Sequence, residues 1–137
     1  AEEPEPRTTF TLPGSGFRKP LLETLGVRFD PADASILHID MSPYVVNTLG
    51  AIQGGVVAMA IDGAADHYAT HVLGGPPCLR SLDIPYLKLA KIGPVRANVS
   101  TIAELENGLI VRVELRDEGQ DDVLLTVASV VLEHAPR

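Results

Sequence analysis

One segment of this 137-residue chain limits its possible folds more than any other. It runs from Gly54 to about Val72 and reads GGVVAMAIDGAADHYATHV, which is too long for a single β-strand. Its first half is apolar on every side, as in a buried helix. Its second half becomes polar, and the Gly-Gly-Pro-Pro sequence at 74–77 would end a helix. We therefore predict a long central helix whose far end reaches solvent.

Most of the remaining chain has β-strand patterns. The strands that we expect are Val27–Phe29, Ser35–Asp40, Leu79–Leu87, Val95–Leu105, Leu109–Arg116 and Val123–Glu133, after a short helix at Phe17–Leu25. Asn107-Gly108 indicates a tight hairpin, and Pro85 indicates an edge strand or a bulge. One buried helix and one antiparallel sheet must cover each other. We predict an α+β hotdog fold, in which a curved antiparallel sheet wraps around one long central helix.

Composition excludes several classes of protein. The hydrophobic fraction of 45% is enough for a core without metal or disulfide. The net charge of −7 argues against general nucleic-acid binding, and no apolar run reaches the ~18 residues of a membrane span. Cys78 is the one cysteine, so an internal disulfide is impossible and a reducing compartment fits. We expect a cytoplasmic protein.

The first residues differ in character from the rest. Ala1–Thr9 reads AEEPEPRTT, which is acidic and Pro-rich where a signal peptide would be apolar. We expect residues 1–16 to form a disordered tail. Residues 17–137 are then expected to form one domain, within the usual size range.

Asp62 lies in the apolar half of the predicted helix. An ionised carboxylate in such surroundings costs several kcal/mol unless something compensates it. Asp62 is therefore either a structural residue, bonded to a strand backbone or to Asn47, or a functional one. Gly63, Ala64 and Ala65 follow it, and they would either leave a slot for a ligand or let two helices pack closely.

The start of the same helix favours function. Gln53-Gly54-Gly55 provides no side-chain cap, and glycines let another group approach the backbone. The first N–H groups of a helix are unpaired and partly positive, which suits an anion or a carbonyl that becomes an oxyanion. The alternative is a tight, Gly-permitted entry into a buried helix.

Helix geometry separates these two elements. Gly55 and Asp62 are seven residues apart, hence ~10.5 Å along one helix. A reacting carbon must lie only ~3 Å from both its oxyanion donors and its attacking group. One helix cannot satisfy both distances, but two antiparallel copies can. Chemistry at this pair of elements therefore predicts a homodimer, or a dimer-of-dimers tetramer, with shared sites.

Residues 47–62, NTLGAIQGGVVAMAID, resemble the signature of the PaaI-like hotdog thioesterases. In that family an Asn precedes a His-Gly-Gly motif, and a catalytic Asp or Glu follows it. Asn47, Gln53 and Asp62 reproduce both spacings, and Ser81-Leu82-Asp83 resembles the next family segment. The resemblance extends over about residues 26–133. Its departure is Gln53, which stands where the family has His.

The resemblance implies hydrolysis of acyl-CoA thioesters. The Gly55 N–H would bind the thioester oxygen, and Asp62 of the partner would attack it or activate water. Gln53 and Asn47 would orient the reactants. Ser81 would hold the water, although an ordinary strand serine is an equal alternative. The family's dehydratase relatives use a catalytic His, so Gln53 speaks against dehydration.

Coenzyme A carries phosphates, which need cations. Lys88, Lys91 and Arg80 are candidates, and the alternative for each is a solvated surface residue. CoA is part of the substrate, so no separate cofactor is expected. His67 and His71 have helical i, i+4 spacing but no second ligand cluster, so no metal is predicted. A non-catalytic acyl-CoA or acyl-ligand binding protein is the second functional hypothesis; a buried Asp62 favours the enzyme.

Overall fold

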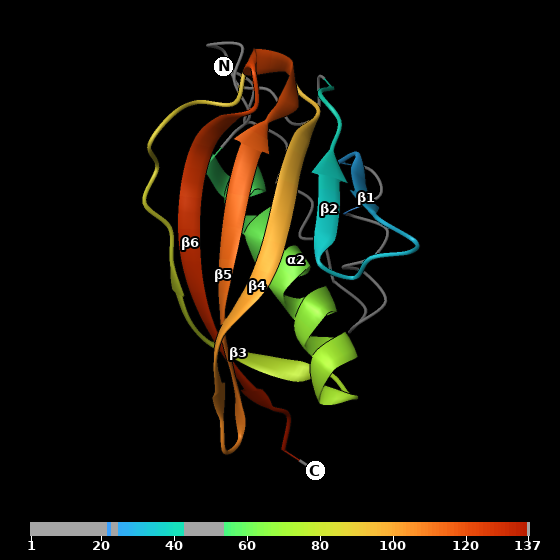
Figure 1. Ribbon diagram of the computed structural model, residues 1–137, viewed down its shortest axis with the longest axis vertical. Coiled ribbons are helices and arrows are strands. Elements are labelled where there is room, and N and C mark those ends of the chain that lie inside the picture. The colour runs from blue at the N-terminus through green and yellow to red at the C-terminus, as the bar shows by residue number, and fades with distance from the viewer. Residues whose placement is uncertain (1–21, 23–24, 43–53, 137) are drawn as a thin grey trace, which may run out of the picture.

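The computed structural model describes residues 22, 25–42 and 54–136 of the chain. The elements in chain order are β1 Val27–Phe29, β2 Ile36–Ile39, α2 Gly54–Leu73, β3 Pro77–Asp83, β4 Val95–Leu105, β5 Gly108–Asp117, the short 3-10 helix η2 Glu118–Gln120, and β6 Val123–His134. The strands form one antiparallel sheet in the order β1-β2-β4-β5-β6-β3. The sheet curves, and α2 lies against one of its faces (Figure 1). The predicted hotdog architecture is confirmed.

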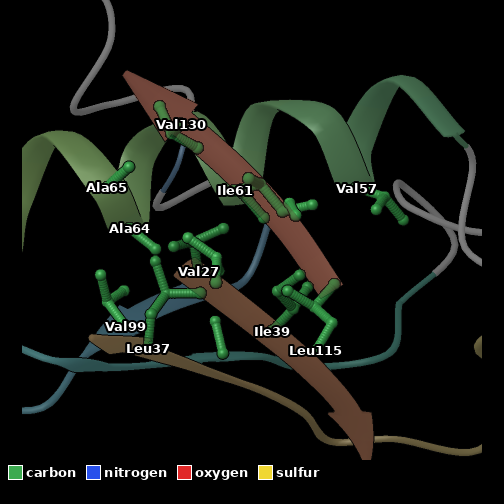
Figure 2. Close-up of a cluster of buried hydrophobic side chains, with 14 of the residues drawn as sticks. Val27, Leu37, Ile39, Val57, Ile61, Ala64, Ala65, Val99, Leu115 and Val130 are labelled. Carbon is green, nitrogen blue, oxygen red and sulfur yellow. The ribbon is translucent and has the colours of Figure 1, made fainter. Parts of the chain in front are cut away.

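Helix α2 was predicted almost to the residue, and its inner side makes the core. Val57, Ile61 and Ala64 point into a cluster with Leu37 and Leu115 from the sheet (Figure 2). Each large side chain buried in this way stabilises the fold by ~1.5–3 kcal/mol. Ala64 and Ala65 belong to this cluster, so they pack within their own chain.

One side of α2 is not fully covered. Ala58, Met59 and Asp62 are only partly buried, and Gly54 and Gly55 are exposed. The expected burial of the helix on every side is therefore only partly met by a single chain. An apolar helix face that its own chain leaves partly open is typical of a surface that contacts something else.

Strand β3 differs from the prediction. It was expected to continue to Leu87, but it ends at Asp83. Pro85 lacks an N–H for a sheet ladder, and its carbonyl instead accepts a hydrogen bond from the Thr126 hydroxyl. The expectation from Pro85 is otherwise confirmed, since β3 is an edge strand with a bulge between Leu79 and Ser81.

The meander β4-β5-β6 follows the sequence pattern closely. The apolar residues that alternate along β5, Leu109, Val111, Val113 and Leu115, are all buried. In β4 the alternating residues Val95, Ala97 and Val99 are buried, whereas residues 100–102 are exposed, and a bulge follows Thr101. The hairpin is confirmed, with Leu105 paired to Gly108 across a two-residue connection.

The predicted tail at 1–16 and most of the predicted helix at 17–25 lie outside the described residues. Leu22 is described, and it is buried beside Gly63 of α2. Within the described ranges no helix is both long and apolar enough to cross a membrane.

Candidate functional site

The site is built around the first turn of α2. Gly54 and Gly55 are exposed there, and the Tyr86 hydroxyl donates a hydrogen bond of 3.1 Å to the Gly54 carbonyl. A Cβ added at Gly55 would meet no atom of the described part of the chain within 4 Å. Packing within that part therefore does not require glycine at this position.

Asp62 lies about two turns further along the same helix. The structure thus confirms that Gly55 and Asp62 are on one continuous helix, ~10.5 Å apart by the helical rise. Asp62 shares its partly buried side of α2 with Ala58 and Met59. Asn47 and Gln53, predicted to orient the reactants, lie outside the described residues.

The segment 84–93 covers the helix start and is held from two sides. Leu87 and Lys88 both donate backbone hydrogen bonds to the carbonyl of Leu125, at 3.0 and 3.2 Å. Further along, the Asp117 carboxylate accepts backbone N–H bonds from three consecutive residues of the segment, Lys91, Ile92 and Gly93, at 3.0, 3.1 and 2.7 Å. The segment is therefore a fixed wall beside the helix start.

Asp117 is fully buried. Burial by itself would raise its pKa, but hydrogen bonds from the Gln120 side chain and from the backbone N–H groups of Ile92, Lys91 and Gly93 outweigh this effect. The pKa of Asp117 is consequently lowered, and the carboxylate is ionised at neutral pH. Its charge holds the wall in place through these hydrogen bonds.

A small pocket lies between the fixed wall and the helix start. Its volume is about 80 Å³. The residues that line it are Gly54, Val57, Tyr86, Lys88, Leu89, Ala90, Leu115, Leu125 and Thr126. Most of these side chains are apolar, so the pocket favours a hydrocarbon group.

The predicted cations separate in space. Lys88 lines the pocket, and Lys91 is exposed in the fixed wall; neither forms an ion pair with a residue that the structure describes. Arg80 is exposed at the β3 bulge and forms an ion pair of 3.3 Å with Glu133. Of the three predicted cations, only Lys88 lines the pocket at the helix start.

The positions of their partners along β6 give the distance between Lys88 and the Arg80 region. Lys88 bonds to Leu125, whereas Ser81, which follows Arg80, pairs with Val131. Six residues of strand span ~20 Å. Ser81 is exposed on the edge strand, so one chain does not bring its side chain to the helix start.

The histidines of α2 lie elsewhere. The His67 ring packs against Phe29, with ring centroids 4.3 Å apart. His67 and His71 line an open hollow with the turn between β1 and β2. Asp30 in that turn accepts hydrogen bonds from the backbone of Ala32 and Asp33, which fixes the turn itself.

Sequence reasoning missed Tyr86, Asp117 and Thr126. Tyr86 and Thr126 fall in predicted strands, and Asp117 falls between two predicted strands; no sequence pattern assigned any of them a role at the helix start. Each acts through a partner 24 to 41 residues away in sequence, so no local pattern could reveal it.

No family model matches the sequence, and no curated protein matches it. Solved structures do match the fold. A thioesterase from Haemophilus influenzae is 18% identical, with 91% of this chain and 90% of that chain covered and a TM-score of 0.74. A variant of a thioesterase from Staphylococcus aureus is 18% identical, with 85% and 99% covered and a TM-score of 0.75.

A third match carries a ligand. A protein from Bacillus halodurans, whose structure was solved with CoA, is 18% identical, with 82% of this chain and 74% of that chain covered and a TM-score of 0.73. At such identities the likeness establishes the fold. This chain has the hotdog fold that the thioesterase superfamily shares.

Proposed function

We propose that the protein hydrolyses acyl-CoA thioesters to a free acid and CoA. The observation that carries the proposal is α2, which has an open glycine turn at its start and a half-buried carboxylate two turns later. The names of structural neighbours, thioesterase among them, and the CoA bound to one of them support the same chemistry. The proposed substrate therefore brings its own CoA, and no separate cofactor is required.

The helix start would bind the thioester oxygen. The N–H groups of the first turn have no partner within the helix, and the helix dipole makes them partly positive. As the carbonyl carbon becomes tetrahedral, its oxygen gains negative charge, which the Gly55 N–H would stabilise. The absence of a side chain at Gly55 lets the thioester approach the backbone.

Asp62 from a second subunit would supply the attack. It either removes a proton from a water that adds to the carbonyl carbon, or attacks that carbon itself before water releases the acid. In both routes the C–S bond breaks, the sulfur leaves as the CoA thiol and the oxygen of water ends in the carboxylic acid. We propose that Gln53 and Asn47 orient the reactants and that Ser81 of a neighbouring chain holds the water.

Two surfaces support assembly into a dimer or a dimer of dimers. The side of α2 that carries Ala58, Met59 and Asp62 is only partly covered by its own chain. Strand β3 is an edge strand whose Leu79 is 45% exposed, and such an edge can pair with another chain. A second copy would cover both surfaces and bring its Asp62 toward the Gly55 turn.

The test of the function replaces one carboxylate. Asp62→Asn removes the charge with almost no change of shape, and we expect kcat for acyl-CoA hydrolysis to fall at least ~1000-fold. The matched control is Asp66→Asn, the same change one turn later on α2, which should keep activity within a few-fold. An Asp62→Asn protein with unchanged kcat would remove the enzyme assignment and favour a binding protein.

The test of the shared site mixes two inactive variants. Asp62→Asn and Gly55→Val each damage a different half of the proposed site. In a randomly mixed population half of the dimers are hybrids, and each hybrid has one intact site, so activity should return to roughly a quarter of wild type. A mixture as inactive as its components, with hybrids shown by mass spectrometry, would contradict a site shared in this way.

A further inference from the structure

The pocket beside the helix start has a mostly apolar lining, and the hydroxyl groups in that lining already donate hydrogen bonds. Val57, Leu89, Ala90, Leu115 and Leu125 supply its hydrocarbon surface. The two hydroxyl groups in the lining already donate hydrogen bonds, that of Tyr86 to Gly54 and that of Thr126 to Pro85. A polar group placed inside would have to give up its water without a free hydroxyl donor in return.

The size of the pocket limits its occupant. An apolar cavity of about 150 Å³ can hold benzene, which has six carbons. The pocket measures about 80 Å³, roughly half of that volume, which is room for about three carbons. A benzoyl ring or a long acyl chain would not fit without rearrangement.

The walls resist such a rearrangement. Leu125 lines the pocket, and its carbonyl accepts the backbone bonds of Leu87 and Lys88. The same segment is held at its other end by the buried Asp117. Outward movement of the wall would break several of these bonds together, so the fold holds this side of the pocket in place.

We propose that this pocket receives the acyl chain, and that the substrate is a neutral aliphatic acyl thioester of about two to four carbons. Gly54 lines the pocket, so the acyl chain would extend from the proposed oxyanion site directly into it. Lys88, exposed beside the same pocket, would remain in water and face the CoA portion. This inference rests on the proposed thioesterase function and assigns its substrate class.

The first arm of the experiment is a substrate profile of the full-length wild-type protein. We would measure kcat/KM with acetyl-, propionyl-, butyryl-, hexanoyl-, decanoyl-, benzoyl- and malonyl-CoA. The value should rise by roughly fourfold for each methylene up to butyryl, the gain expected for burying one CH₂. It should then fall by roughly tenfold or more for hexanoyl, decanoyl and benzoyl, and the charged malonyl group should be disfavoured.

The second arm changes the volume of the pocket. Leu125→Ala removes three carbons from the wall and should move the optimum two to three carbons longer. The matched control is Leu132→Ala, an equally buried leucine of β6 at the far end of the sheet, which should leave the profile unchanged. Ala90→Val adds bulk to the wall instead, and it should reduce kcat/KM for butyryl-CoA relative to acetyl-CoA. This variant also provides a test if Leu125→Ala does not fold.

The outcomes separate the two proposals. An activity that depends on Asp62 but peaks at hexanoyl, decanoyl, benzoyl or malonyl would overturn the short-acyl assignment and leave the thioesterase function in place. Identical profiles for Leu125→Ala and Leu132→Ala, with Ala90→Val also unchanged, would do the same. No hydrolysis of any thioester, or hydrolysis that Asp62→Asn does not affect, would overturn the function and the pocket assignment together.

Discussion

Two glycines at opposite ends of the molecule show different reasons for having no side chain. Gly108 begins β5, and a Cβ there would lie 2.0 Å from the backbone oxygen of Leu132. Gly55 is in the first turn of α2, where an added Cβ would meet no described atom within 4 Å. Packing within the described residues requires the hairpin glycine but not the helix glycine.

This difference separates residues that serve the fold from residues that serve a site. A glycine in a helix costs ~1 kcal/mol relative to alanine, and no contact within the described part of the chain requires glycine at position 55. Two explanations remain for it, a bound substrate or a second subunit, and the proposed site requires both. Around Gly108 the backbone of β6 already explains the residue.

The largest expected effect is on stability at the hairpin. Gly108→Ala places a Cβ against the backbone of β6, with Glu133 Cα at 2.9 Å as a second close atom. Neither backbone atom can move without disturbing the strand pair, so we expect the free energy of unfolding to fall by about 3 kcal/mol. Urea denaturation would measure it. A variant as stable as wild type would show that the strands separate there at little cost.

Gly55→Ala should have the opposite effect, because it should preserve stability and reduce activity. The helix gains a better helix former without a clash, so the free energy of unfolding should stay constant or rise by up to about 1 kcal/mol. The added methyl group would displace the thioester from the N–H, and kcat/KM should fall by roughly 100-fold. Parallel denaturation and kinetic measurements test both halves. A fully active Gly55→Ala protein would show that nothing approaches the backbone at this turn.

Asp117 allows the fixed wall to be tested by pH. Its folded-state pKa is lowered, mainly by hydrogen bonds that overcome its burial, so its stabilising effect is fully present above the unfolded-state pKa of ~3.9 and is lost as pH falls through the folded-state value. Asp117→Asn loses these charge-assisted bonds and should be about 2 kcal/mol less stable at neutral pH.

Measuring the stability difference between wild type and Asp117→Asn over a range of pH tests the direction of the pKa shift. The stability difference between wild type and Asp117→Asn should be constant above about pH 5 and shrink below about pH 4. Asp121→Asn, an exposed carboxylate four residues later, serves as the control and should show little difference at any pH. A gap for Asp117→Asn that widened toward low pH would contradict the lowered pKa.

The sequence predicted those parts of the molecule that repeat a local pattern. Helix α2, the hairpin before Gly108 and the alternating β5 follow from spacing of apolar residues and from turn chemistry. The wall at 84–93 could not be predicted, because Asp117 and Thr126 form it through contacts that no local period encodes. The pocket proposed for a short acyl chain is bounded by that wall, so its size is apparent only from the structure.

The smallest expected effect concerns the cations, and it sharpens the contrast between the two ends. Lys88 lines the pocket at the helix start, whereas Arg80 lies ~20 Å away along β6 with Glu133 as its ion-pair partner. An exposed contact to a phosphate contributes ~0.5–1 kcal/mol, so Lys88→Ala should raise KM for a CoA thioester roughly two- to fivefold with kcat unchanged. Arg80→Ala should leave KM within twofold in the same assay.

Raising the salt concentration should reduce the difference in KM between wild type and Lys88→Ala, since ions screen an exposed pair. A larger KM change for Arg80→Ala than for Lys88→Ala would place the phosphates over the edge strand and require CoA to lie across the β3 side of a neighbouring subunit.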